Sequence, residues 1–153
     1  MSEDDNSLVD MVNMAIEATI PAAASMGVRA VEVGRGHAVT TVPIEGNGNH
    51  FGAIYAGVQF TVAEVLGGAI TAGTFDTSAF YPLVKSFDIA FRAMARTDLR
   101  AEATLAEDEI VRVGAEAAER GKADFVLEAV VTDTDGTTIA TTRGVYQLRA
   151  FGR

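Results

Sequence analysis

One acidic residue lies inside the longest apolar stretch of this 153-residue chain. The stretch covers residues 49–74 and reads NHFGAIYAGVQFTVAEVLGGAITAGT, with Glu64 near its middle. Because a buried carboxylate without a partner is unstable, an acid at this position requires an explanation. An apolar environment would raise the pKa of the Glu64 carboxyl and suit it to act as a general base. The alternative is a structural carboxylate that pairs with an arginine or caps a backbone turn.

The composition of the whole chain limits the classes of protein to which it can belong. Its length predicts one domain, and a hydrophobic share of 48% with a charged share of 22% is typical of a soluble globular protein. The absence of cysteine excludes disulfides, thiolate catalysis and cysteine metal sites. A net charge of −9 disfavours nucleic acid and anionic membranes as main partners. The acidic start, MSEDDNS, is unlike a secretory signal, so we expect a cytoplasmic protein.

The apolar stretch predicts a central helix over about residues 53–73. At 100° per residue, Gly57, Thr61 and Gly68 fall on the same side of this helix as Glu64. The opposite side carries larger apolar residues, namely Tyr55, Val58, Val62, Leu66 and Ala69. Polar residues and glycines interrupt the stretch, so a helix buried in a protein is favoured over a membrane span. One side can therefore pack on a sheet, while the side with the acid stays accessible to a ligand.

The rest of the chain predicts an α+β domain. Helical spacing indicates a first helix that begins at Asn6 or Ser7, is broken or kinked at Pro21 and closes at Gly27. Strands are predicted at residues 28–33, 37–44, 83–95, 99–105, 125–131 and 139–148, and a short helix at residues 106–120. The simplest architecture is a long antiparallel sheet of about six strands wrapped around the central helix. Residues 1–27 form an N-terminal helix that belongs to the domain, and residues 28–153 form its main body.

Residues 49–68 resemble the motif of hotdog-fold acyl-CoA thioesterases of the PaaI-like type. In that motif a loop Asn or Gln precedes a turn into the central helix, and an Asp or Glu follows two turns along it. Asn49 precedes Glu64 by 15 residues and Gly57 precedes it by seven, which are the spacings of that family. The resemblance extends from about residue 28 to 148 and is strongest to the uncharacterised thioesterase-like branch. It implies the hotdog fold and hydrolysis of an acyl thioester.

The resemblance also implies roles for individual residues. Glu64 would be the base or nucleophile, the backbone N–H groups of Ala56 and Gly57 would stabilise the oxyanion, and Asn49 would orient the carbonyl or water. Gly57 and Glu64 are about 10 Å apart along one helix, so both cannot reach one carbonyl carbon. The site is therefore expected at the interface of a homodimer with antiparallel helices, which can pair again into a dimer of dimers. No cofactor is expected, since coenzyme A is part of the substrate.

Six residues are predicted to contact the substrate: His50, Tyr55, Phe60, Gly68, Arg92 and Arg96. Arg92 and Arg96 would hold the nucleotide phosphates of coenzyme A, because guanidinium groups bind phosphate well. The alternatives are solvated charge for the arginines, core packing for the aromatic residues and a loop contact for His50. The second histidine, His37, falls within a predicted strand and is interpreted as structural. No metal site is expected, because His50 has no second His or Cys nearby in the sequence.

Two other functions remain open at this point. Tyr55 stands where many family members have His, Ala56 where they have Gly, and Gly68 where they have Ser or Thr. These departures allow a non-catalytic acyl-CoA-binding protein. His50, followed by Glu64 14 residues later, is similar to the His and Glu pair of hotdog 3-hydroxyacyl thioester dehydratases. That alternative ranks lower, because the spacing from Gly57 to Glu64 differs from that of the dehydratases.

Overall fold

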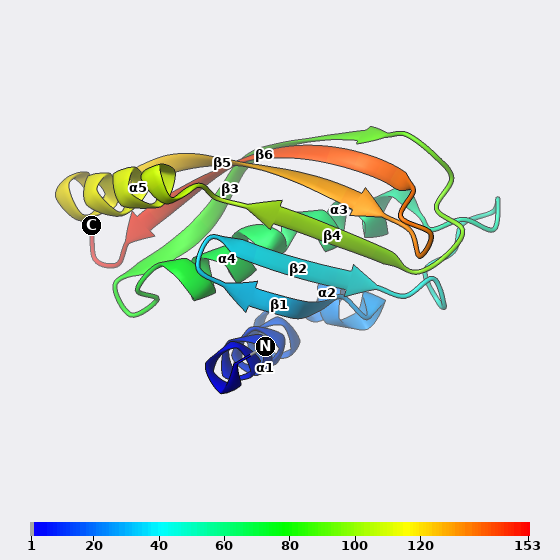
Figure 1. Ribbon diagram of the computed structural model, residues 1–153, viewed down its shortest axis with the longest axis horizontal. Helices are drawn as coiled ribbons and strands as arrows, with labels where there is room; N and C mark the ends of the chain where they lie inside the picture. The colour runs from blue at the N-terminus through cyan, green and yellow to red at the C-terminus, as the bar shows by residue number, and fades with distance from the viewer. Residues whose placement is uncertain (1) are drawn as a thin grey trace.

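The computed structural model describes residues 2–153 as one α+β unit with a single antiparallel sheet (Figure 1). The strands are β1 (Arg29–Gly34), β2 (His37–Val42), β3 (Phe80–Phe91), β4 (Leu99–Thr104), β5 (Lys122–Thr132) and β6 (Thr138–Ala150). The helices are α1 (Glu3–Thr19), α2 (Pro21–Met26), α3 (Ala56–Glu64), α4 (Leu66–Thr74) and α5 (Glu107–Arg120). The strand order is β1-β2-β4-β5-β6-β3, so β1 and β3 form the two edges of the sheet. The predicted fold class is thereby confirmed.

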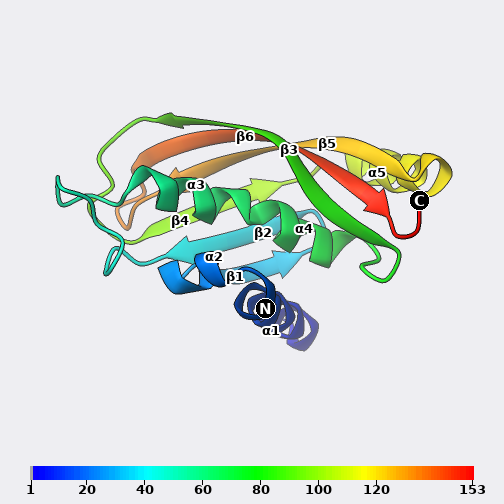
Figure 2. The same cartoon turned by 180° about the vertical axis from the view of Figure 1, so that it is seen from behind.

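The central helix is present, but in two parts. Helices α3 and α4 lie end to end across one face of the sheet, as Figure 2 shows. Their larger apolar side chains, including Val58, Val62 and Leu66, are buried against the strands, as the periodicity predicted. Val65 separates the two helices, and the predicted single helix over residues 53–73 was wrong in this respect. The helix also begins later than predicted, at Ala56, because Ile54 forms an isolated antiparallel bridge with Gly48.

The N-terminal segment forms two helices rather than one. Helix α1 begins at Glu3 and not near Asn6, because Ser2 and Asp5 form a capping box. The Ser2 hydroxyl accepts a 3.1 Å hydrogen bond from the Asp5 N–H, and the Asp5 carboxylate accepts one from Ser2 N–H. Pro21 does not kink α1 but opens α2, where a missing N–H is tolerated. Gly27 ends α2 in the left-handed conformation at φ 81°, as predicted.

Helix α1 closes one edge of the sheet. The buried side chain of Asn13 donates to the Ala30 carbonyl at 2.9 Å and accepts from the Ala30 N–H at 2.8 Å. These two bonds satisfy backbone groups on the outer side of β1, which no strand pairs. At the other edge, β3 pairs only with β6, and the side chains of Leu83, Val84 and Phe91 are exposed. The two edges therefore differ: β1 is covered and β3 is open.

The remaining elements follow the predicted order. Strand β3 begins at Phe80 and ends at Phe91, earlier at both ends than predicted. Helix α5 buries Ile110, Val113 and Ala117, and it packs on β5 and β6 at one end of the sheet (Figure 1). Within residues 2–153, no helix combines the length and apolar character needed to cross a lipid bilayer.

Candidate active site

Glu64 is the last residue of α3 and faces a cleft of about 160 Å³. The cleft is lined by residues of four elements and two helix junctions: Ile20, Glu64, Val65, Gly68, Pro82, Leu83, Val84 and Tyr146. Leu83 and Val84 belong to the open edge strand β3, so the cleft lies beside that edge. Gly68 lines the cleft one turn beyond the acid, and its lack of a side chain keeps the space in front of Glu64 open. A carboxylate in mainly apolar surroundings is the feature that suggests chemistry here.

The Glu64 carboxylate is half-buried, and among the described residues it forms no ion pair or hydrogen bond. The alternative of a structural acid paired with an arginine is therefore not found in this chain. Burial raises the pKa of the Glu64 carboxyl above its ordinary value, since the charged form loses hydration that no partner replaces. Such a carboxylate holds a proton more readily than an exposed one and is a stronger base once ionised.

Tyr146 supports the backbone at Glu64, and the sequence alone did not indicate it. Its Oη donates a 2.8 Å hydrogen bond to the Glu64 carbonyl, where the helix is interrupted before Val65. Burial, and to a lesser degree the charge of Glu64, raise the pKa of the Tyr146 phenol well above its ordinary value. The phenol therefore stays protonated and can donate at neutral pH. The two residues are 82 positions apart, and nothing local to either one predicts their contact.

The buried Tyr146 ring also explains one of the two adjacent glycines in α4. A Cβ on Gly67 would overlap the ring atom Cε1, whereas a Cβ on Gly68 would meet nothing within 4 Å. Packing against Tyr146 therefore requires glycine at position 67. Among the described residues, no neighbouring atom requires glycine at position 68. Gly67 thus has a structural role, whereas Gly68 borders the cleft and is not needed for packing.

The other predicted catalytic groups lie at the opposite end of α3. Ala56 and Gly57 are its first two residues, so their N–H groups have no acceptor inside the helix. Tyr55 precedes them without a capping side-chain bond, and its ring covers Gly57, where a Cβ would lie 2.6 Å from Tyr55 Cε1. These N–H groups remain available to an anion at the helix N-terminus. Glu64 is about 10 Å further along the axis, so the two ends are separate within one chain.

Asn49 and His50 lie in the loop that leads into α3. Asn49 Oδ1 accepts hydrogen bonds from the N–H groups of Phe51 at 2.9 Å and Ala53 at 3.2 Å, which hold the loop in shape. Both bonds engage Oδ1 and neither engages Nδ2, which would be the donor in an orienting role. His50 is exposed, and its ring centroid lies 4.0 Å from that of Phe51. Its position fits the predicted loop contact as well as a substrate contact.

The two arginines predicted to bind phosphate lie at this same end of the molecule. They belong to the connection between β3 and β4, which is joined to the start of α3 by a 2.7 Å hydrogen bond from Ile54 N–H to the Ala95 carbonyl. Arg92 and Arg96 are both exposed, and Arg92 donates to Thr141 Oγ1 at 3.2 Å. The bond to Ala95 thus brings the neighbouring Arg96 near the helix start, whereas the side chain of Arg92 bonds to Thr141 of β6, and both arginines are accessible to solvent.

The predicted residues therefore fall into two groups within one chain. The residues at the helix start and its flanking loops are Asn49, His50, Tyr55, Ala56, Gly57, Arg92 and Arg96. Glu64 and Gly68 lie at the middle of the paired helices, with Phe60 one turn before the acid. Phe60 is exposed and makes an edge-to-face contact with Phe87 of β3, with 4.7 Å between ring centroids. It therefore lies on the open side of α3, toward the edge strand.

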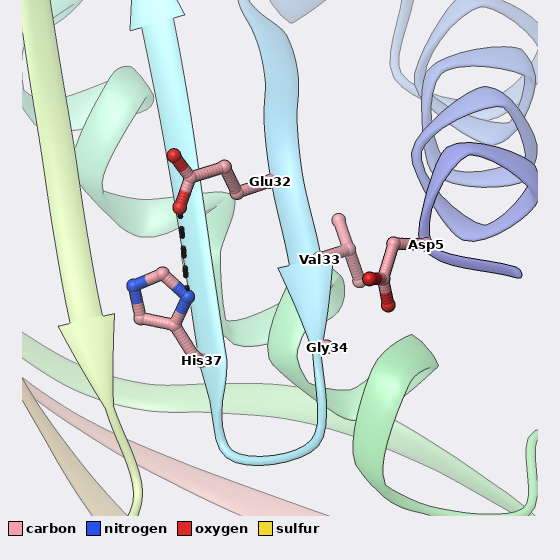
Figure 3. A pocket seen from close by; sticks show the side chains of 5 residues that line it. All are labelled: Asp5, Glu32, Val33, Gly34 and His37. Carbon is pink, nitrogen blue, oxygen red and sulfur yellow. Dashed lines mark ion pairs between the residues drawn. The ribbon is translucent and has the colours of Figure 1, made fainter. Parts of the chain in front are cut away.

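His37 belongs to a separate ion-pair cluster on three strands. Its Nε2 lies 2.6 Å from Glu102 Oε2 on β4, and its Nδ1 lies 3.8 Å from Glu32 Oε2 on β1. Figure 3 shows Glu32 and His37 on neighbouring strands, with Asp5 of α1 across β1 from them. Ligand atoms of these two glutamates and His37 lie within 4.8 Å of one another, a set that can hold a divalent cation. Arg100 already pairs with both glutamates, at 3.2 and 3.9 Å, which supports the structural interpretation of His37.

Comparisons with known proteins identify the class of this fold. A structure of PA5026 from Pseudomonas aeruginosa, described as a protein of unknown function and probable thioesterase, is 39% identical with a TM-score of 0.85, over 92% of this chain and 95% of that one. OLEI01261 from Chlorobaculum tepidum TLS, of unknown function, has a TM-score of 0.85 at 17% identity, over 95% of this chain and 96% of its own. Thioesterase HI1161 from Haemophilus influenzae has a TM-score of 0.75 at 13% identity, over 95% and 92%.

The resemblance to the hotdog-fold thioesterase superfamily is thus confirmed at the level of fold. The family model described as Domain of unknown function (DUF4442) matches residues 10–147. The chain belongs to the DUF4442 family. Among curated proteins, the comparison found no match.

Proposed function

We propose that this protein hydrolyses an acyl thioester, with an acyl-CoA as the expected substrate and Glu64 as the general base. The observation that carries the proposal is the unpaired, half-buried Glu64 carboxylate, whose pKa is raised by burial in a cleft at the open edge of the sheet. The similarity to structures described as thioesterases, including one at 39% identity, supports the same reaction.

In the proposed reaction the Glu64 carboxylate takes a proton from a water molecule, whose oxygen attacks the carbonyl carbon of the thioester. The C–S bond of the tetrahedral intermediate then breaks, and the proton passes from Glu64 to the departing sulfur. The products are a carboxylic acid and a free thiol. The backbone N–H groups of Ala56 and Gly57 would stabilise the oxyanion, since the N-terminus of a helix favours developing negative charge.

A second copy of the chain would complete the site. The helix start and Glu64 are about 10 Å apart in one chain, too far to act on one carbonyl carbon. Leu83 and Val84 belong both to the open strand β3 and to the Glu64 cleft. A two-fold pairing of β3 with its copy would therefore bring each cleft to the interface, where the partner's helix start can approach it. We propose a homodimer with two shared sites, which can associate further into a dimer of dimers.

The nucleotide end of coenzyme A would bind near Arg92 and Arg96. Both arginines are exposed, and Arg96 follows Ala95, whose carbonyl bonds to Ile54 just before α3, where the proposed oxyanion donors are. Replacing both by Glu should raise the Michaelis constant for an acyl-CoA but leave it unchanged for an acyl thioester of N-acetylcysteamine, which lacks the nucleotide. Equal effects on the two substrates would exclude the phosphate-binding role.

Release of free thiol from a panel of acyl-CoA substrates tests the proposed activity directly. The panel should include a 3-hydroxyacyl-CoA, for which loss of water without thiol release would indicate a dehydratase. Tight binding of acyl-CoA with no release of thiol would indicate the binding protein instead. Hydrolysis that persists in Glu64→Gln would exclude the proposed base.

Mixing two inactive variants tests whether the site is shared. Asn49→Asp keeps an oxygen to accept the loop bonds but loses the Nδ2 donor, and Glu64→Gln loses the base. Equal mixing with subunit exchange should restore about a quarter of wild-type activity, because half of the dimers are mixed and each has one intact site. If each variant is inactive alone and the mixture stays inactive despite verified exchange, the two groups act within one chain.

A further inference from the structure

An apolar groove of about 370 Å³ runs along the seam between α1 and α4. It is lined by Met11, Val12, Ala15, Ile16, Thr19, Ile20, Val65, Gly68, Ala69, Ala72, Thr77 and Pro82. No charged side chain lines the groove. The Thr19 hydroxyl donates to the Ala15 carbonyl at 2.6 Å, so its hydrogen is already used within α1. The lining thus offers a ligand mainly apolar contact.

The groove adjoins the cleft that contains Glu64. Four residues line both spaces: Ile20, Val65, Gly68 and Pro82. Leu83 and Val84 line the cleft on the side of the β3 edge, and the four shared residues line it on the side of the groove. A molecule whose reactive carbonyl lies beside Glu64 can extend an apolar group from there between α1 and α4. The N-terminal helices, which showed no motif in the sequence, thereby become part of the site.

The dimensions of the groove indicate the size of the apolar group. Its lining on α1 extends from Met11 to Ile20, a rise of about 13.5 Å along the helix. An extended alkyl chain is a zigzag that advances about 1.25 Å per C–C bond, so about eleven or twelve carbons cover that distance. Ala15 lies about midway, roughly 7.5 Å from the Ile20 end. A flat aromatic acyl group would use only the part of the groove nearest to Glu64.

From this arrangement we infer that the groove between α1 and α4 binds the alkyl chain of the substrate, and that the protein selects straight-chain acyl groups of medium length, about ten to twelve carbons. The inference rests on the proposed hydrolysis for the identity of the ligand. The groove itself is defined by its own residues, so it can be tested separately from catalysis.

Two matched substitutions on α1 test the groove. Ala15→Leu places a larger side chain in the middle of the groove, and Ala18→Leu places the same side chain on an exposed position of α1 that does not line it. Both residue types favour helices, so neither change should unfold α1. In Ala15→Leu the Michaelis constant for decanoyl-CoA should rise about tenfold or more, since several methylene groups lose their apolar contacts. For hexanoyl-CoA it should change less than about twofold, and Ala18→Leu should match the wild type for both.

A binding measurement makes the test independent of turnover. The fluorescence of dansyl-labelled undecanoic acid should rise on addition of wild-type protein and of Ala18→Leu, and this response should be lost in Ala15→Leu. Equal responses in the two variants, or equal chain-length profiles, would overturn the inference. If the probe binds as expected but no acyl-CoA is hydrolysed, the proposed hydrolysis fails while the groove stands as a site for alkyl chains.

Discussion

Glu64 combines a position that suits a base with a charge that the fold does not stabilise. Its carboxylate has no partner among residues 2–153, and burial alone raises its pKa. Replacement by Gln should lower the kcat/KM for thioester hydrolysis about 10²- to 10⁴-fold, the usual range for loss of a general base. The same change should raise the melting temperature at pH 7 by a few degrees, because a neutral amide is easier to bury than a carboxylate.

The direction of this stability effect with pH follows from the raised pKa. The folded protein binds the Glu64 proton more tightly than the unfolded chain, so this residue favours folding at low pH. That contribution is lost as the pH rises through the folded-state pKa, and above it the ionised group is destabilising. The melting temperatures of the wild type and Glu64→Gln should therefore differ at neutral pH and become equal in acid. A constant difference at every pH would show that the carboxyl group is not responsible.

The two adjacent glycines of α4 should respond in opposite ways to the same substitution. Gly67→Ala should destabilise the protein by about 1–3 kcal/mol, since its methyl group would overlap the Tyr146 ring. Gly68→Ala meets open space and should stabilise α4 by about 0.5–1 kcal/mol. Because Gly68 lines the Glu64 cleft, its methyl group should also lower activity despite the gain in stability. Urea unfolding and thiol release measure the two effects, and similar results for both variants would contradict the packing described.

For individual residues, the sequence identifies Glu64 as a candidate base but does not reveal which residues surround it. An acid in an apolar segment is visible directly, and so is the side of the helix that it shares with Gly68. Tyr146 and Ile20 reach the cleft only through the fold, from positions far away in the chain. The distinction between Gly67 and Gly68 also depends on the position of the Tyr146 ring. Periodicity places residues on a face of a helix, but it does not say what packs against that face.

At the scale of elements, the side chain of Asn13 joins α1 to β1 through two hydrogen bonds, beside the buried apolar residues Val12 and Ile16. Asn13→Ala should lower the free energy of unfolding by about 2–4 kcal/mol, because it leaves the buried N–H and carbonyl of Ala30 without partners. Asn6→Ala is the matched control on the same helix, where the side chain is exposed, and should change stability by less than about 0.5 kcal/mol. Urea titration measures both, and equal effects would show that α1 is held by its apolar face alone.

Most helices and strands were predictable, whereas their ends and interruptions were less so. The alternation in β5 and the apolar face of α5 follow from local patterns. The capping box of Ser2 and Asp5 was also present in the sequence, but the more central Asn6 and Ser7 were favoured as caps. The interruption at Val65 has no Pro or other local signal, and it coincides with the hydrogen bond from Tyr146. Contacts between distant segments decided the features that local propensity could not.

At the scale of the whole molecule, the open strand β3 predicts the oligomeric state. Val84 on β3 is 44% exposed, and Val130 on the central strand β5 is 45% exposed. Val84→Lys should convert the proposed dimer to a monomer, since a charge would be buried between two edges. Val130→Lys changes the same residue type at equal exposure and should leave the dimer intact. Light scattering gives both masses, and a wild-type monomer with full activity would refute the shared site.

The contrast between the two sheet edges has a consequence for how large an assembly can become. A sheet with two unpaired edge strands can polymerise, because each added copy leaves another unpaired edge to which the next copy can bind. Here Asn13 and α1 cover one edge, so growth through the proposed pairing of β3 would stop after a single addition. Any larger particle has to be built by stacking faces of the sheet or its helices. Removal of α1 would expose the backbone edge of β1. The protein should then form fibres instead of a discrete oligomer.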